Sequence, residues 1–291
     1  MTNIIRPSSK ELETILGIEY PILENGYISV VDYMGTEDSI LSAARRSYGK
    51  GTKSVLEDRN LLRYLIRHFH TSPTEMAEIA FSMDMPILTA RQFIRHRTAN
   101  VNEYSARYSE MEDIFYVPLP ENIAVQSKTN KQGRGSEGVE FKDETKARIR
   151  EIIQENNEET FARYQKLLAL DLSRELARTV LPVNIHTNWT WKIDVNNLMK
   201  FLRLREDGHA QYEIRVYANK MAEIFELWMP NVHEAYIDYI RDAVNLSKQQ
   251  FEILKSSIKR LEDGFNFDFH IGNKPDRMSK REFDDLLALF A

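Results

Sequence analysis

The sequence contains no cysteine among its 291 residues. This absence excludes disulfide bonds, cysteine-ligated zinc and iron–sulfur clusters. It also excludes an enzyme that attacks its substrate with a cysteine thiolate. Any mechanism that depends on a thiol is therefore ruled out.

Long apolar runs are also missing. No run approaches the roughly 20 residues that a membrane-spanning helix needs. The first residues, MTNIIRPSSKELE, lack the basic region and apolar stretch of a signal peptide. We therefore expect a cytoplasmic protein with no membrane partner.

A surplus of basic residues is absent as well. The formal net charge is −5, which argues against a general nucleic-acid partner. Four arginines nevertheless fall between Arg91 and Arg107, and this local cluster suits a small anionic ligand better than a long polyanion. The seven histidines show no metal-ligand spacing, so we expect no metal site.

Hydrophobic periodicity predicts a helix-rich chain with a few non-consecutive strands. Strands are expected over 27–33, 77–85 and 184–193, with strand or extended chain over 107–120. Helices are expected over 36–46, 57–69, 86–97, 144–170, 172–181 and 194–204, within 210–246, and over 251–261 and 279–290. Because strands and helices do not alternate regularly, the expected fold class is α+β: a helix-rich single domain with a small mixed or antiparallel sheet.

The chain divides by composition into a main domain and two flanking segments. Residues 1–25 form an N-terminal lead-in, loosely attached over its first 20 residues, and 26–246 form the domain. Within it, 126–143 is polar and reads as an exposed insertion. Residues 247–291 form a helical C-terminal extension.

The insertion contains a glycine motif, Gly133-Arg-Gly-Ser-Glu-Gly138, that matches G-x-G-x-x-G. A dinucleotide-binding fingerprint requires a strand before the motif and a helix that opens at it. The preceding run, SKTNKQ, has no apolar strand pattern. We therefore interpret the motif as a flexible loop.

Arg95, His96 and Arg97 form an ionisable triplet near the end of the helix expected over 86–97. Their side chains fan out by about 100° each, so they do not share one helix face. A solvated helix end that complements the helix dipole explains such a triplet taken alone. However, a dense polar stretch with no clear helix or strand pattern follows over 98–107. Arginines beside such a loop suit phosphate and nucleobase recognition.

Arg205 follows Leu198, Phe201 and Leu202 at helical spacing, so it lands on the apolar face of its helix. A half-buried arginine needs an anionic or strongly polar partner. A structural ion pair and a functional role are equally open. His209 lies one turn further on, and a lone histidine is more often a packing residue than a ligand.

The turn HTSPTE, residues 70–75, separates an expected helix from an expected strand. Ser72 and Glu75 have the spacing of a capping box, so a structured turn is the simpler interpretation. A loop held between rigid elements is also a good place for a site residue.

The run R-H-R, seven residues and then Ser, from Arg95 to Ser105, resembles the signature of the flavin-dependent thymidylate synthase family. Further blocks resemble the family in the same order: HTSPTE, ARQFIRHR, NEYSARYS, ELARTVLP and LMKFLRLREDGHAQYEI. The resemblance covers roughly residues 26–246, which is a whole domain and not a lone motif.

The resemblance implies a reaction, cofactors and an assembly. The family reductively methylates dUMP to dTMP, with 5,10-methylenetetrahydrofolate as carbon donor and NADPH as reductant through bound FAD. Its members share one fold and form homotetramers with active sites shared between subunits. Unrelated thymidylate synthases attack uracil with a cysteine thiolate, a route that this chain cannot follow. The pyrimidine must instead be activated electrostatically.

The resemblance also implies site residues, carried over position by position. Arg205 matches the catalytic arginine at the uracil ring, where a fixed cation favours the N3-deprotonated pyrimidine. The other implied dUMP contacts are Gln92, Arg95, Glu103, Tyr104, Ser105, Ala106, Arg107 and, from a neighbouring subunit, Arg178. The implied FAD contacts are Ser72, Glu75, Arg95, His96, Arg97, Glu103, Asp194, Asn196, Lys200 and His209.

Three of these positions depart from the family pattern. Members often carry Asn near 194, Arg near 196 and Asn near 200, where this chain has Asp194, Asn196 and Lys200. Asp194 can accept hydrogen bonds but would repel a nearby phosphate. Ser105 has no base identifiable beside it in the sequence, so a hydrogen-bonding role toward the nucleotide is preferred to a nucleophilic one.

Two other functions remain open at this point. A non-catalytic nucleotide- or RNA-binding module using the cluster at 91–107 predicts steeply salt-dependent binding to polynucleotide. A degenerate family member with a structural or regulatory role could use its C-terminal helices as an interaction surface.

Overall fold

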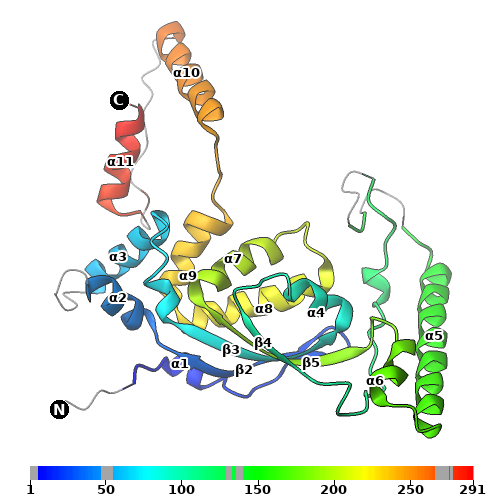
Figure 1. The fold of residues 1–291 in the computed structure, drawn as a ribbon. Coiled ribbons are helices and arrows are strands. Elements are labelled where there is room, and N and C mark those ends of the chain that lie inside the picture. The colour runs from blue at the N-terminus through cyan, green and yellow to red at the C-terminus, as the bar shows by residue number, and fades with distance from the viewer. Residues whose placement is uncertain are drawn as a thin grey trace, which may run out of the picture. The chain divides into compact units, whose positions relative to one another are not determined.

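The computed structural model describes residues 6–46, 55–128, 133–135, 140–265, 275 and 278–290. The chain divides into two compact units, Met1–Arg241 and Asp242–Ala291. The first unit is built on an antiparallel sheet covered by helices (Figure 1). The α+β, helix-rich fold expected from the sequence is therefore confirmed.

The sheet has five strands in the order β1-β2-β3-β5-β4. They are β1 (Tyr20–Ile22), β2 (Gly26–Met34), β3 (Glu78–Pro86), β4 (Asn100–Glu103) and β5 (His186–Asp194). Strands β3 and β5 pair along their whole length, from Glu78 opposite Asp194 to Pro86 opposite His186. In β3 alternate side chains are buried, as the period of a strand requires. The three strands predicted from hydrophobic patterning are confirmed.

Helices α4 (Ile87–Phe93), α7 (Val195–Arg205) and α8 (Tyr212–Trp228) pack over the sheet (Figure 1). Phe93 joins them: its ring stacks on Phe201 at 5.0 Å and meets Trp191 at 5.5 Å and Tyr217 at 6.1 Å. Such aromatic pairs contribute about 0.5–1.5 kcal/mol each beyond the area they bury. This cluster therefore fixes the ends of α4 and α7 relative to each other.

A second, smaller apolar cluster lies where α5 (Asp143–Ala169) and α6 (Arg174–Ala177) meet the chain before them (Figure 1). It contains Met111, Phe115 and Ile185, together with the fully buried Tyr164. The Tyr164 hydroxyl accepts a hydrogen bond from the Met111 amide at 3.1 Å. This packing holds the segment after β4 against the start of β5.

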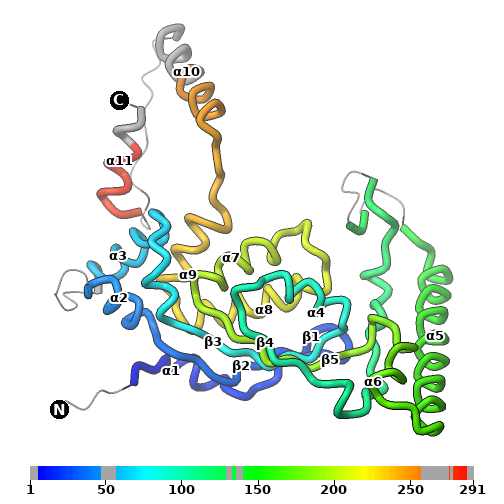
Figure 2. The backbone as a smooth tube through the Cα atoms, in the orientation of Figure 1, coloured from blue at the N-terminus to red at the C-terminus, as the bar shows by residue number. Residues whose placement is uncertain are grey.

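The N-terminal segment is part of the core. Helix α1 (Lys10–Glu13) brings the fully buried Leu12 into the main apolar cluster, and Leu16 forms a bridge with Val30 of β2 (Figure 2). The prediction of a loosely attached lead-in is therefore wrong for this part. The sequence pattern missed this packing because the start of the segment is mostly polar, with only one apolar side chain per helical turn.

The remaining helices follow the predicted ranges. They are α2 (Glu37–Arg46), α3 (Val55–Arg67), α9 (Pro230–Tyr236), α10 (Lys248–Phe265) and α11 (Lys280–Phe290), with short turns η1 (Thr74–Met76), η2 (Pro120–Asn122), η3 (Arg178–Val180) and η4 (Ile237–Arg241). The last two α-helices belong to the second unit. No helix in the described ranges has the length and apolarity needed to cross a membrane.

Three predictions of local structure need correction. The helix expected to reach Arg97 ends at Phe93, because the chain turns back to pair Asn100–Glu103 with β5. That strand, β4, was not predicted, since all four of its residues are exposed and show no apolar alternation. The segment 107–120 forms only an isolated bridge, between Phe115 and Ile185.

Candidate active site

Arg205 is the last residue of α7, half-buried behind the aromatic cluster. Its Nε donates a hydrogen bond to His96 Nε2 at 3.0 Å. The His96 ring packs edge-on against Phe201, with centroids 4.7 Å apart. Among the described residues Arg205 has no carboxylate partner, so the ion-pair interpretation of this arginine is wrong.

The electrostatics of this pair keep the charge on the arginine. Burial, and then the positive charge of Arg205, lower the pKa of His96 to about 4. His96 is therefore neutral near pH 7, which lets Nε2 accept the hydrogen bond. Burial lowers the pKa of Arg205, but a guanidinium remains protonated. The result is an uncompensated cation whose two terminal nitrogens have no protein partner in the described structure.

The other arginines of the triplet lie on the turn between α4 and β4. Arg95 and Arg97 are exposed, and neither side chain pairs with a described carboxylate. Gln92, on the last turn of α4, donates from Nε2 to the side-chain oxygen of Gln211. The turn thus presents two unpaired guanidinium groups, a donor set suited to phosphate.

A pocket of about 310 Å³ lies beside the end of β4, between the segment Glu103–Ala106 and Arg178. Glu103 accepts a hydrogen bond from the Thr187 hydroxyl at 2.8 Å, and the Tyr104 hydroxyl donates to the Glu110 carbonyl at 2.6 Å. The Ser105 hydroxyl accepts from the amide of Arg107, and no base contacts it among the described residues. A nucleophilic role for this serine has no structural support.

Arg178 lies in this same pocket, in its own protomer. Its Nε donates to the Glu175 carbonyl at 3.3 Å, while the Glu175 carboxylate pairs with Arg107 at 3.0 Å. Arg178 and the segment Glu103–Ala106 of one chain therefore line the same pocket, and the expectation that a neighbouring subunit supplies the phosphate arginine stays a prediction. The terminal nitrogens of Arg178 stay available to a ligand.

A third group gathers at the start of α7. Asn196 donates to Glu75 at 3.2 Å, which links the helix to the HTSPTE turn. That turn closes on the Thr71 carbonyl, which accepts from Thr74 N at 3.0 Å and Glu75 N at 3.2 Å. The capping box predicted for Ser72 and Glu75 does not form, and the Glu75 carboxylate accepts from Asn196 instead.

Asp194 caps helix α7. Its two carboxylate oxygens accept from the Asn197 backbone amide at 3.0 Å and the Asn197 side-chain amide at 2.6 Å. Lys200 lies one turn on, 3.5 Å from the Asn197 side-chain oxygen. The departure from asparagine at 194 therefore has a structural use, since aspartate is an equally good N-cap.

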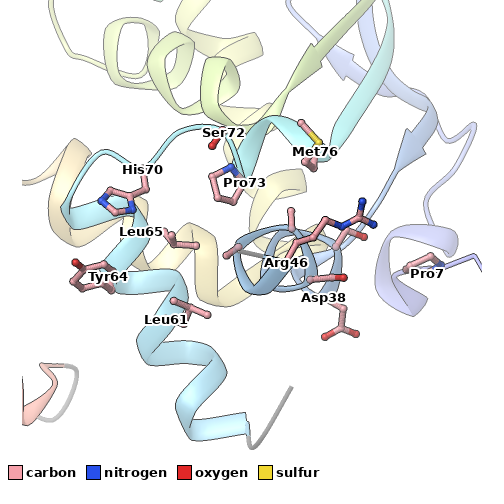
Figure 3. A pocket seen from close by; sticks show the side chains of 14 residues that line it. Pro7, Asp38, Arg46, Leu61, Tyr64, Leu65, His70, Ser72, Pro73 and Met76 are labelled. Atoms are coloured by element: carbon pink, nitrogen blue, oxygen red, sulfur yellow. The ribbon is translucent and has the colours of Figure 1, made fainter. Parts of the chain in front are cut away.

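The HTSPTE turn also borders a larger cavity of about 1000 Å³, formed with α2 and α3. Figure 3 shows His70, Ser72 and Pro73 of the turn on one side and Arg46 projecting from α2. The cavity contains both a cation and hydroxyl groups, and its volume is ample for part of a dinucleotide.

The site residues expected from the sequence thus form separate groups within one chain. Asp194 and Arg205 bracket α7, about 15 Å apart by the helical rise. No hydrogen bond or ion pair between described residues joins the Arg205 group to the Glu103–Arg178 pocket. His209 stands apart: its side chain is 83% exposed and pairs with Asp207. It is therefore not a packing residue.

Comparison with known proteins gives this arrangement a family. The model of the family described as thymidylate synthase complementing protein matches residues 29–231. The chain is 45% identical to the flavin-dependent thymidylate synthase of Wolbachia pipientis wMel, over 96% of this chain and 95% of the relative. It is 48% identical to that of Ruegeria pomeroyi, over 86% and 83%.

The chain belongs to this family. Among solved structures, the fold is similar to that of PolB, a UMP/dUMP methylase from Streptomyces cacaoi, bound with 5-Br dUMP. The TM-score is 0.68 at 30% identity, and the match covers 76% of this chain and 99% of the other. The PolB structure bound with 5-Br UMP matches with a TM-score of 0.67. The resemblance to flavin-dependent thymidylate synthases is therefore confirmed.

Sequence reasoning missed a buried carboxylate and the polar side chains that surround it. Glu213, only 1% exposed, is surrounded by Tyr116, Arg134 and Gln211. The sequence did contain a signal for this carboxylate. Glu213 precedes Tyr217 by four residues and Met221 by eight, so all three lie on the apolar face of α8. A carboxylate on such a stripe predicts a buried, paired charge.

Proposed function

We propose that this family member is a flavin-dependent thymidylate synthase that methylates C5 of dUMP. The proposed carbon donor is 5,10-methylenetetrahydrofolate and the proposed reductant is NADPH, acting through FAD. The observation that carries this proposal is Arg205: a half-buried cation held by a neutral histidine, in a chain without cysteine. Such a cation can activate a pyrimidine where no thiolate can attack it.

Arg205 acts on the uracil ring through charge. Its terminal nitrogens can donate to two adjacent acceptors on a planar ring edge. Because the cation persists at neutral pH, it stabilises the N3-deprotonated ring, in which C5 is more electron-rich. His96 orients Arg205 without neutralising it, since a neutral imidazole accepts a hydrogen bond but contributes no negative charge.

The Glu103–Arg178 pocket is the proposed nucleotide site. The phosphate is bound by the free nitrogens of Arg178 together with the Arg107 guanidinium, while Glu103, Tyr104, Ser105 and Ala106 form its wall. Guanidinium forks match phosphate oxygens, which supports this orientation of dUMP. Gln92 and Arg95 complete the nucleotide contacts.

The donor groups on this chain fit FAD. Arg95 and Arg97 are exposed cations without carboxylate partners in the described structure, as a pyrophosphate requires. Ser72, Glu75, Asn196, Lys200 and His209 are the further proposed contacts, and Asp194 acts first as a helix cap. When bound, FAD accepts reducing equivalents from NADPH and supplies the hydride. The protein residues bind and orient it.

We also propose that the active site is assembled from more than one chain. No hydrogen bond or ion pair between described residues joins the Arg205 group to the Glu103–Arg178 pocket, and the proposed mechanism needs both for one nucleotide. A homotetramer with shared sites brings them together, and closed symmetric assemblies are the common way to build such interfaces.

Spectroscopy and an isotope assay test the proposal directly. The purified protein should show flavin absorbance that NADPH bleaches. With methylenetetrahydrofolate it should release tritium from [5-³H]dUMP, because methylation replaces the C5 hydrogen. A colourless protein that cannot be reconstituted with FAD would overturn the proposal.

A further inference from the structure

Glu213 is the most deeply buried carboxylate beside the proposed nucleotide site. It lies in the first turn of α8 and is 1% exposed. Burial by itself would raise its pKa, but hydrogen bonds from Tyr116 and Arg134, with the charge of Arg134, lower the pKa overall. Glu213 is therefore ionised at neutral pH and can only accept hydrogen bonds.

Both oxygens of this carboxylate are used. Oε1 accepts from the Tyr116 hydroxyl at 2.7 Å and from Arg134, while Oε2 accepts from Gln211 Nε2 at 2.8 Å. Gln211 in turn accepts, through its own Oε1, the hydrogen bond from Gln92 Nε2. A continuous relay thus runs from a buried charge to a residue of the proposed nucleotide site.

The relay has a fixed direction. A side-chain amide has one acceptor end and one donor end. Because Glu213 accepts only, Gln211 must point its NH₂ group at the carboxylate and its carbonyl at Gln92. Gln92 must then use its NH₂ group on Gln211, which leaves its carbonyl oxygen unengaged among the described residues. The nucleotide therefore meets a hydrogen-bond acceptor at Gln92.

Arg134 ties the insertion to this relay. Arg134 forms an isolated antiparallel β-bridge with Gln126, and the amide of the next residue, Ser127, donates to the Gly133 carbonyl at 2.9 Å. Gly135 is needed there, since a Cβ would lie 2.9 Å from the Ser127 Cα. The Arg134 guanidinium also lies 5.8 Å from the Tyr212 ring centroid. The first part of the glycine motif thus delivers a cation to Glu213.

We propose that Glu213 is a positioning residue for dUMP, acting through Gln211 to hold the Gln92 carbonyl toward a hydrogen-bond donor of the nucleotide. Arg134 keeps the carboxylate ionised and fixed. The donor on dUMP is the sugar hydroxyl, because N3 of the ring is deprotonated in the proposed mechanism. This inference rests on the proposed function, because it needs Gln92 to contact dUMP.

The test uses the flavin-loaded holoenzyme and the variant Glu213→Gln. A glutamine can donate as well as accept, so the relay loses its fixed direction while side-chain volume is kept. We expect the KM for dUMP to rise by about two- to tenfold, the effect of one neutral hydrogen bond, with a smaller change in kcat. In a Gln92→Ala background, Glu213→Gln should have no further effect on KM. Additive effects of the two substitutions would overturn the inference.

A swapped pair separates positioning from structural support. In Glu213→Gln/Gln211→Glu the acceptor-only group moves to position 211, so Gln92 must again donate and present its carbonyl. Recovery of the wild-type KM supports the relay, whereas a KM that stays raised overturns it. If Glu213→Gln does not fold, Gln211→Ala interrupts the relay at an exposed residue. An unchanged KM in that variant would equally overturn the inference.

Two further results distinguish the inference from the proposed function. If Gln92→Ala releases tritium at the wild-type rate with an unaltered KM for dUMP, the inference is overturned and the proposed function stands. If the wild-type protein shows no turnover, both the inference and the proposed function are overturned. With 2′,3′-dideoxyuridine monophosphate, coupling between Gln92 and Glu213 disappears if the sugar hydroxyl is the donor. Coupling that persists with this analogue would overturn the inference.

Discussion

Arg205 and His96 show how a protein can hold a cation without cancelling it. A carboxylate partner would orient Arg205 but would also neutralise its charge. Full exposure to water would instead screen the electric field of the guanidinium. Neutral His96 orients the guanidinium through one hydrogen bond of 3.0 Å, and Phe201 fixes the imidazole ring. In the proposed mechanism, the full positive charge of Arg205 is then available to the pyrimidine of dUMP.

Replacing Arg205 tests this role. We expect Arg205→Ala to reduce tritium release about 10²- to 10³-fold, the usual cost of removing a group that stabilises developing charge. Arg205→Lys should recover little, because an ammonium cannot provide two parallel donors. Arg203→Ala is the matched control: Arg203 lies on the same helix but is exposed, so turnover should be unchanged. Equal activity of Arg205→Ala and wild type, with flavin bound, would refute the assignment.

The pKa of His96 predicts a pH dependence of stability. It is about 4 in the folded protein against an ordinary 6.5, so between these values the unfolded chain binds a proton that the native chain does not. Stability must therefore fall as pH drops from 6.5 to 4, with no further contribution from His96 below that range. In His96→Asn, which has no titrating group there, Tm should decline less steeply over this interval. Parallel Tm curves for the two proteins would contradict the assignment.

For single residues, the sequence predicted which side chains are half-buried but not which side chains they contact. The helical spacing that put Arg205 on an apolar face was enough to predict a half-buried cation. His96 is 109 positions away along the chain, and nothing in the sequence pairs the two without the fold. The same holds for Glu213, whose partners Tyr116 and Arg134 lie on distant segments.

Among the elements, α7 links the two ends of the proposed flavin and nucleotide region. Its start is stabilised by Asp194, and its end carries Arg205. Substituting Asp194→Ala should lower the free energy of unfolding by about 0.5–2 kcal/mol in urea denaturation, the usual cost of losing an N-cap. Asp194→Asn should stay near wild type, because asparagine caps equally well.

The same pair of variants shows whether Asp194 has a second role. If it serves as a cap, Asp194→Asn should retain flavin at least as well as wild type, since it removes a negative charge near the proposed cofactor site. Flavin content is measured from the absorbance of the purified protein. A folded Asp194→Asn variant that loses flavin would show that the carboxylate itself contacts the cofactor.

Elements with strong periodicity were predictable, and those set by pairing were not. The 27-residue α5 and the alternating β3 follow from local patterns. Strand β4 has four exposed residues and exists because β5 offers it a free edge. That pairing also ends α4 at Phe93, four residues before the predicted end, and so places the arginine triplet on a turn. Tertiary contacts, which no local pattern encodes, decided these boundaries.

At the level of the whole molecule, the proposed function needs a partner chain to combine the Arg205 group with the Glu103–Arg178 pocket. The sequence resemblance implied shared sites with Arg178 from a neighbouring subunit, and the structure adds that Arg178 and Glu103 of one chain line one pocket. In the proposed assembly, a complete site takes Arg205 from one subunit and Arg178 from another. A chain that lacks Arg205 should then still supply Arg178 to a shared site, and a chain that lacks Arg178 should still supply Arg205.

Mixed oligomers of Arg205→Ala and Arg178→Ala chains test this division. Each variant alone should be nearly inactive, since every site lacks one of the two arginines. After co-expression, a site is intact when its Arg205 comes from an Arg178→Ala chain and its Arg178 from an Arg205→Ala chain. With random assembly this occurs in about one quarter of sites, so tritium release should return to about one quarter of wild type. If both arginines of a site came from one chain, mixing would restore nothing, because every chain carries one of the two lesions.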